Sequence, residues 1–250
     1  MTYRLLTILI VLLAIPVQAQ HVRHAVQRFD EGNRSFQEGD FETALASYLE
    51  AEASGYVSGA LYFNMGNAHF RLDEMGEAIR HYEKARVWMP NSAELAHNLV
   101  VAQERTVDTF SRLPDPFWRM ARHRLGDVLS PAALYVLGLL FYTASAGALA
   151  VRIRRGKSPW LRRIAAVGGV LAVCFVGLGI GSSYERARDV RAVVLADAVR
   201  LLEQPNGAAS EVDIHEGTMV DVLATRGAWS EIRLPNGVRG WIQVEAYGTI

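Results

Sequence analysis

The sequence has almost no cysteine and no recognisable catalytic motif. Its single cysteine, Cys174, cannot form an intramolecular disulfide, so every domain must be stabilised by packing alone. No paired carboxylates or nucleophile motif occur. His21 and His24 have no partner at metal-ligand spacing and are interpreted as a disordered tail, while the other histidines are scattered singly. We therefore expect no enzymatic activity, no catalytic residue, no cofactor and no metal site.

The chain also has no net charge, but its charges are unevenly distributed. The formal charge is zero, whereas residues 20–110 and 192–250 are acidic and residues 111–191 are basic. Acidic flanks argue against nucleic-acid binding by either of them. A basic middle segment is typical of the ends of membrane helices.

Two segments of the middle region contain no charged residue at all. They cover 132–151 and 164–183, and Ser130 with Pro131 supplies a helix N-cap and first turn for the former. About 20 helical residues cross a hydrocarbon core of about 30 Å. The pattern predicts two transmembrane helices, at 130–151 and 164–183. A buried helical hairpin in a soluble protein is the alternative.

The predicted loop between the two spans, 152–163, is strongly basic and has no acidic residue. Its cations are Arg152, Arg154, Arg155, Lys157, Arg162 and Arg163. Short basic loops stay on the cytoplasmic side of a membrane. These six residues are therefore the predicted topology determinants, and the regions before and after the hairpin are expected on the opposite side. Within the second span, we expect Gly177 and Gly181 to pack against small residues of the first.

The N-terminal segment 1–19 is predicted to be a secretory signal peptide. Arg4 precedes an apolar run, and small residues stand at the expected cleavage site before Gln20. An uncleaved membrane anchor is the alternative. Export of the mature N-terminus gives the same orientation as the basic loop, although the two rules are independent.

The segment 20–108 contains an internal repeat, because one pattern of residues recurs at a constant spacing. Seven pairs are identical at that shift: Phe29/Phe63, Gly32/Gly66, Asn33/Asn67, Phe36/Phe70, Ala44/Ala78, Tyr48/Tyr82 and Ala51/Ala85. The small residues allow two helices to approach closely and the aromatic residues fill the space between them. We predict helix pairs at 25–58 and 59–92 and a capping helix at 93–106.

These residues resemble the tetratricopeptide repeat (TPR) family. The second unit carries the family pattern in Gly66, Asn67, Phe70, Ala78, Tyr82, Ala85 and Pro90. The resemblance implies an all-α array whose first helices form a peptide-binding groove, and the matching positions are Phe29, Asn33, Phe63, Asn67 and Arg71. The two asparagines would hydrogen-bond a peptide backbone. Alternatively, they only satisfy backbone groups between helices.

The segment 109–129 joins the repeats to the first predicted span. Proline residues break any helix near 114–116, and aromatic and basic residues follow. Tryptophan, phenylalanine and arginine together favour the lipid headgroup layer, so we expect an interfacial helix, with a plain linker as the alternative.

The pattern changes to short strands and turns in 190–250. Strands are predicted at 192–195, 219–223, 230–234 and 240–242, with turns at 204–207, 216–217, 226–227 and 235–237. Asn236 and Gly237 are expected to form a hairpin turn because both accept positive φ. Such a pattern indicates a small all-β barrel.

This region resembles the bacterial SH3-like (SH3b) domain. The residues that match are Gly217, Val220, Val222, Trp229, Asn236, Gly237, Gly240 and Trp241. Leu202 stands where arginine is common in the family, which leaves cell-wall binding open. Trp229 and Trp241 form a ligand platform or complete a very small core.

The order of the segments, rather than any one of them, resembles the tetratricopeptide (BatE-type) proteins of bacterial aerotolerance (Bat) operons. That resemblance implies a two-pass inner-membrane protein with both terminal domains in the periplasm. It also implies a non-enzymatic scaffold in an envelope stress complex, with membrane proteins bearing von Willebrand factor A domains as partners. The alternative function is peptidoglycan binding through the SH3-like domain.

Overall fold

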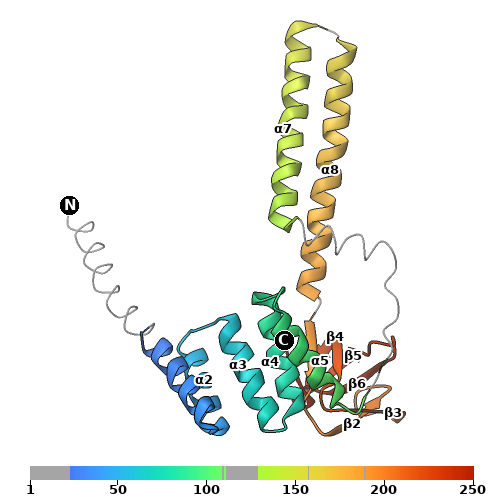
Figure 1. The fold of residues 1–250 in the computed structure, drawn as a ribbon. Helices are drawn as coiled ribbons and strands as arrows, with labels where there is room; N and C mark the ends of the chain where they lie inside the picture. The colour runs from blue at the N-terminus through green and yellow to red at the C-terminus, as the bar shows by residue number, and fades with distance from the viewer. Residues whose placement is uncertain (1–22, 109, 111–128, 157, 189) are drawn as a thin grey trace, which may run out of the picture. The chain divides into compact units, whose positions relative to one another are not determined.

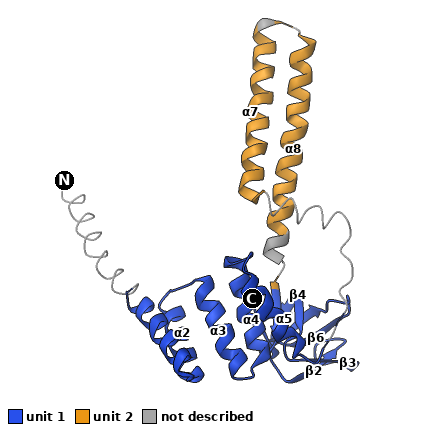
Figure 2. Cartoon of the chain, viewed as in Figure 1, with its two compact units in different colours: residues 1–111, 191–250 blue, residues 112–190 orange. Residues whose placement is uncertain are grey.

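The computed structural model describes residues 23–108, 110, 129–156, 158–188 and 190–250. They belong to two compact units, one formed by residues 1–111 and 191–250 and the other by 112–190 (Figure 2). The predicted signal peptide and most of the predicted interfacial segment lie outside the described residues. Each unit is described by itself below.

Helix pairs build the N-terminal part of the first unit (Figure 1). A helix at 23–38 precedes α2 (Phe41–Ala53), and α3 (Gly59–Arg71) is followed by α4 (Met75–Trp88) and α5 (Ala93–Glu104). Side chains cap three of them: Asp40, Ser58 and Ser92 each accept a hydrogen bond from the backbone N–H three residues later. The predicted helical repeats are confirmed.

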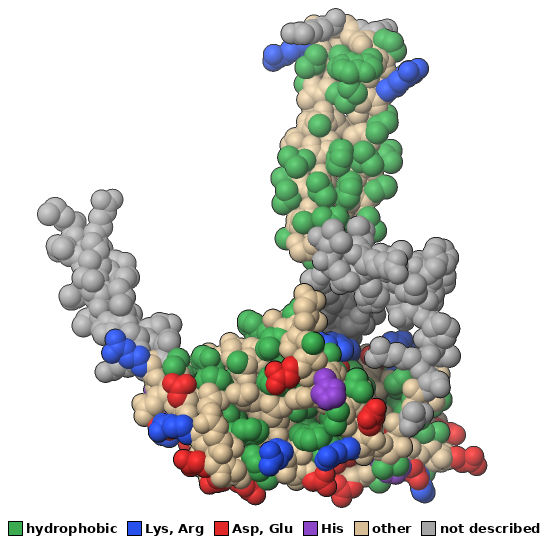
Figure 3. All heavy atoms as spheres, viewed as in Figure 1, with side chains coloured by type: hydrophobic (Ala, Val, Ile, Leu, Met, Phe, Trp, Pro, Cys, Tyr) green, Lys and Arg blue, Asp and Glu red, His purple; other side chains and the backbone are tan. Residues whose placement is uncertain are grey.

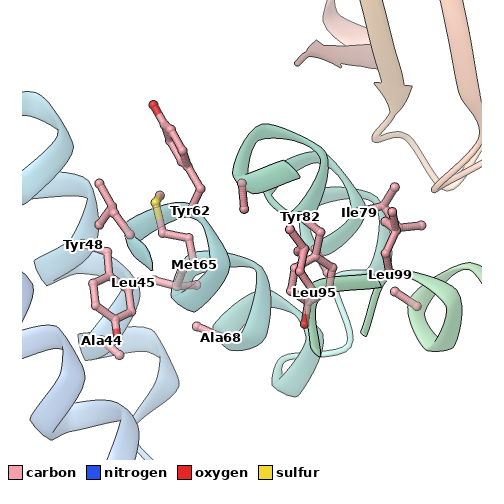
Figure 4. Packing of buried hydrophobic residues seen from close by; sticks show 14 of the residues in the cluster. Ala44, Leu45, Tyr48, Tyr62, Met65, Ala68, Ile79, Tyr82, Leu95 and Leu99 are labelled. Carbon is pink, nitrogen blue, oxygen red and sulfur yellow. The ribbon is translucent and has the colours of Figure 1, made fainter. Parts of the chain in front are cut away.

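One glycine in each helix pair sets the spacing between its two helices. A Cβ on Gly66 would lie 2.5 Å from Cδ1 of Tyr82, and the same distance would separate a Cβ on Gly32 from Cε1 of Tyr48. Both tyrosines are buried in a continuous core that runs through the repeats (Figure 4). The close helix contact predicted from the repeat is therefore made by glycine against a tyrosine ring.

The C-terminal part of the first unit is a seven-stranded sheet. Its strands are β1 (Val190–Val194), β2 (Ala198–Leu202), β3 (Ala209–His215), β4 (Met219–Arg226), β5 (Trp229–Arg233), β6 (Arg239–Gln243) and β7 (Tyr247–Thr249). The order is β3-β2-β6-β5-β4-β1-β7. The ladders with a defined register are antiparallel. The predicted strands correspond to β1, β4, β5 and β6. Sequence reasoning missed β2, β3 and β7, which have weak apolar alternation or are very short.

The predicted turns are present, with one difference at the hairpin turn. Gly237 has a φ of 87°, but Asn236 does not adopt positive φ. Asn236 instead accepts a hydrogen bond from the N–H of Val238 at 3.1 Å. Asn206, in the earlier predicted turn, does adopt the left-handed region, with a φ of 59°.

The sheet and the repeats, predicted as separate segments at 190–250 and 20–108, share a core. Val193 belongs to the repeat core, and Met219 and Ile250 pack against it. Polar contacts cross the same boundary. Asp108 accepts hydrogen bonds from the backbone N–H of His215 (2.6 Å), from its Nδ1 (2.9 Å) and from the hydroxyl of Thr218 (2.5 Å). The sheet therefore closes the end of the helical array.

The N-terminus of α4 is capped from the sheet. Its own N-cap residue, Glu74, makes no side-chain cap hydrogen bond. Glu216, in the turn between β3 and β4, instead accepts from the N–H of Gly76 at 2.7 Å. A carboxylate at a helix N-terminus satisfies an orphan donor and interacts favourably with the helix dipole. Local sequence reasoning cannot find this cap, because 140 residues separate the two partners.

The second unit is a helical hairpin of α7 (Pro131–Arg155) and α8 (Pro159–Arg188). Both helices are long and apolar enough to cross a membrane, judged by length and composition. Figure 3 shows hydrophobic side chains along the visible face of the hairpin and Lys or Arg side chains near the turn between the helices. Ser145 donates a hydrogen bond to the carbonyl oxygen of Ala165 at 2.6 Å, and the rings of Phe141 and Phe175 stack.

Two details of the hairpin differ from the predictions. Helical structure continues through most of the predicted loop at 152–163, where Gly156 and Ser158 are the only described residues outside helices. Arginine is a good helix former, so a basic segment need not be a loop. Gly177 and Gly181 do not pack against α7, because a Cβ on either would meet no atom within 4 Å. The close approach is instead at Gly138, Gly168 and Gly179.

Candidate functional site

The repeats carry a pocket of about 250 Å³. Residues of the helix at 23–38, α3, α4 and α5 line it: Phe36, Asn67, Phe70, Arg71, Tyr82, His97, Asn98 and Val101. We call it the repeat pocket. Aromatic walls combine there with amide, imidazole and guanidinium groups. Such a pocket suits a peptide segment with apolar side chains and polar or acidic groups.

The predicted groove residues do not all meet there. Asn67 and Arg71 line the repeat pocket, whereas Phe29, Asn33 and Phe63 are not among its lining residues. Phe29 and Phe63 pack against the repeat core, each with its ring centroid 5.9 Å from that of a buried tyrosine. Phe36 and Phe70, which are also one repeat apart, supply aromatic surface in the pocket instead.

Asn33 and Asn67 use their carbonyl oxygens to join three helices. Oδ1 of Asn67 accepts from the hydroxyl of Tyr82 at 2.8 Å and from Nδ2 of Asn98 at 2.9 Å. Oδ1 of Asn33 accepts from Tyr48 at 3.0 Å and from Asn64 at 2.8 Å. The asparagines thus make side-chain bonds between successive helices, and only their amide N–H₂ groups remain for a peptide.

Asn64 and Asn98 were missed by sequence reasoning. The available signal was their spacing, because Asn64 and Asn98 are one repeat apart, as Asn33 and Asn67 are. Burial raises the pKa of Tyr48 and of Tyr82 to about 12, with the neighbouring amides Asn64 and Asn98 acting in the opposite direction. Both phenols therefore stay protonated at neutral pH and remain donors.

Two arginines, one repeat apart, cover aromatic rings beside the pocket. The guanidinium of Arg71 lies 4.4 Å from the ring centroid of Phe41, and that of Arg105 lies 4.3 Å from that of Phe70. Stacking positions each cation at its ring while its N–H groups can still meet an acidic group, as Arg105 does with Asp73 at 3.8 Å. These arginines give a positive border to a unit that is acidic in composition.

The two tryptophans of the sheet lie on one face. Trp229 pairs with Gln243, and Trp241 pairs with Glu231 on the same two strands, so all four side chains point the same way. The sheet core is on the other face, which carries Ile232 and Ile242. Trp241 is nevertheless buried, with the guanidinium of Arg226 at 5.4 Å from its ring.

The predicted topology determinants lie at the ends of α7 and α8 that face the turn. Arg152, Arg154 and Arg155 belong to α7, and Arg162 and Arg163 belong to α8. Lys157 lies outside the described residues.

The structure also brings together two histidines that are apart in the sequence. His69 of α3 lies beside His81 of α4, and Glu77 stands one turn before His81. Burial, followed by the positive charge of Arg80, lowers the pKa of His81 to about 2. The available signal was the four-residue spacing of Glu77 and His81, which puts both on one side of a helix.

Comparisons with known proteins give little further information. No protein-family model matches the chain, and no curated protein matches it. Among solved structures, a TPR repeats protein from Bacteroides fragilis is 18% identical. The match covers 65% of this chain and 93% of that one, with a TM-score of 0.23.

Proposed function

We propose that this chain is a membrane-anchored scaffold that holds a partner protein at the repeat pocket. The observation that supports it most directly is the pocket itself, where Asn67, Arg71 and His97 stand among aromatic side chains. Arg71 and His97 are exposed, so they are available to a ligand. The partner segment is extended and carries an acidic group beside apolar side chains.

The hairpin of α7 and α8 is the proposed anchor in a bacterial inner membrane. Its support is the length and apolar composition of both helices, together with the basic residues beside their turn. In this arrangement the turn is cytoplasmic, while the repeats and the SH3-like sheet are periplasmic. Partners with von Willebrand factor A domains and a role in envelope stress or aerotolerance follow from the resemblance in domain order.

A photocrosslinking experiment tests the pocket. A crosslinking amino acid is placed at His97 in the full chain in intact cells, and at Leu49 in α2 as an exposed control outside the pocket. We expect a defined crosslinked product from position 97 that decreases in an Arg71→Glu background. Equal products from both positions, or none from position 97, would contradict the proposal.

Peptidoglycan binding is the second candidate function, favoured by the placement of Trp229 and Trp241 on one face of the sheet. The sheet shares its core with the repeats, so the full chain in detergent is the proper sample. We expect co-sedimentation with purified cell wall that is lost in Trp229→Ala if this function holds. Failure of the unchanged chain to co-sediment excludes it.

A further inference from the structure

Three potential ligand residues meet between the helices of the second pair. His69 comes from α3, and Glu77 and His81 come from α4. Each offers one ligand atom, and these atoms all lie within 4.8 Å of one another. The imidazole rings of His69 and His81 are stacked, with their centroids 4.9 Å apart and their planes at 20°.

Hydrogen bonds determine which nitrogen of each imidazole is available. Nδ1 of His81 lies 2.9 Å from the backbone carbonyl oxygen of Glu77, which can only accept. Nδ1 of His69 lies 2.6 Å from Oε2 of Glu74, a carboxylate oxygen. Both Nδ1 atoms therefore carry a hydrogen, and Nε2 keeps the free lone pair on each ring. Metal-binding histidines show this arrangement, in which the second nitrogen donates to a carboxylate or a carbonyl.

We propose that His69, Glu77 and His81 bind a late first-row divalent cation, with Zn²⁺ as the reference ion. Two imidazoles and one carboxylate match the donors of known three-residue zinc sites, with water in the fourth position. Ca²⁺ and Mg²⁺ prefer all-oxygen sites. The bound ion would join α3 to α4 and so stabilise the helix pair that contributes half of the residues lining the repeat pocket.

The neighbouring charges support the choice of ion. Arg80 donates to Oε2 of Glu77 at 2.6 Å, which leaves Oε1 as the ligand oxygen. The positive charges of Arg80 and the nearby Lys84 repel any cation, so an ion that binds by electrostatic attraction alone would not be held there. Binding therefore depends on coordination by the imidazole nitrogens.

Binding also requires movement of the ligands. Donor atoms of a tetrahedral zinc site are about 3.3 Å apart, given bonds of about 2.0–2.1 Å, so the ligand atoms have to come closer together than they are here. His69 and Glu77 have partly exposed side chains that can rotate, whereas His81 is 2% exposed and stays in place.

The test uses the full chain in detergent, purified without a polyhistidine tag and treated with EDTA. Co²⁺ is titrated as a spectroscopic probe, and Zn²⁺ is then added to displace it. We expect the chain to bind one equivalent of Co²⁺. The bound ion should show the strong visible absorption bands of tetrahedral or five-coordinate Co²⁺. His69→Gln and Glu77→Gln should each weaken binding at least tenfold. His97→Gln, an exposed histidine outside the cluster, is the matched control and should leave the affinity unchanged.

Further controls separate binding from folding. His81 is buried and its replacement can unfold the chain, so the two variants of the partly exposed ligands decide the outcome. Circular dichroism without metal must show the same helix content for both. His21→Gln with His24→Gln removes adventitious binding at the N-terminus. Unchanged Co²⁺ affinity in His69→Gln and Glu77→Gln, or an equal loss in His97→Gln, overturns the proposal. None of these results depends on the proposed scaffold function.

Discussion

Replacing Asp108 tests whether the sheet stabilises the end of the helical array. Its carboxylate accepts three hydrogen bonds, from two donors on His215 and one on Thr218, and its side chain is 10% exposed. A hydrogen bond to a charged group contributes about 1.5–3 kcal/mol, and bonds that share one acceptor group are not additive. His215 is one-third exposed and can bind water instead, whereas Thr218 is buried. We therefore expect Asp108→Ala to cost about 3 kcal/mol.

Two further variants separate the loss of charge from the loss of contact. Asp108→Asn keeps one acceptor oxygen, so we expect about half the cost. Asp73→Asn is the matched control: its carboxylate is 86% exposed and lies 3.8 Å from Arg105. Asparagine, unlike alanine, tolerates the positive φ of 65° at this position. Exposed ion pairs contribute less than about 1 kcal/mol. The Asp73 variant should therefore differ little from the unchanged chain.

The assay is urea unfolding of the full chain in detergent, combined with amide hydrogen exchange. Exchange should rise most at Gly217 and Val194, because the N–H of Gly217 donates to Val194 and that of Val194 donates to Thr218. An equal shift for Asp108→Asn and Asp73→Asn, or unchanged exchange at these amides in Asp108→Ala, would refute the reasoning.

Three other predictions concern packing and pH. Gly66→Ala should destabilise the repeats by about 1–2 kcal/mol in urea unfolding, because the clash with Tyr82 outweighs the gain in helix propensity. In the hairpin, Gly138→Leu should disrupt packing in a protease-resistance assay, whereas Gly177→Leu should not, because only Gly138 faces the other helix. Burial alone would raise the pKa of Asp108, but hydrogen bonds from Thr218 and His215 outweigh it and lower the pKa below 3.8. The contribution of Asp108 to the free energy of unfolding should be complete above about pH 4 and should be lost as the pH falls below that value. Unfolding measured over a pH series should show this loss only when Asp108 is present.

Much of the helical part could be predicted because its signals are local or periodic. The constant spacing of identical residues identified the helix pairs, and the identical Gly66 and Gly32 marked the close approach to tyrosine. The uncharged segments likewise identified α7 and α8. Each of these signals depends on neighbours within one helix or on repetition of one unit, which the chain displays directly.

The candidate sites were harder to predict because they depend on which helices are adjacent and how each is rotated. Family position suggested Phe29 and Phe63 for the groove, yet the aromatic residues that line the repeat pocket are Phe36, Phe70 and Tyr82. The bonds of Asn33 and Asn67 to tyrosine and asparagine follow from the distances between three helices. Gly177 and Gly181 show the same limit, since spacing identifies a helix face but not its neighbour.

The sequence by itself determined the repeat, the two long apolar helices, the charge distribution and most of the turns, because all of these are written in local composition and spacing. Only the tertiary structure decided that the sheet shares a core with the repeats through Val193, that Glu216 caps α4, and that His69 meets Glu77 and His81. These contacts join residues from different elements. Their existence depends on packing, and neither propensity nor periodicity encodes packing between distant segments.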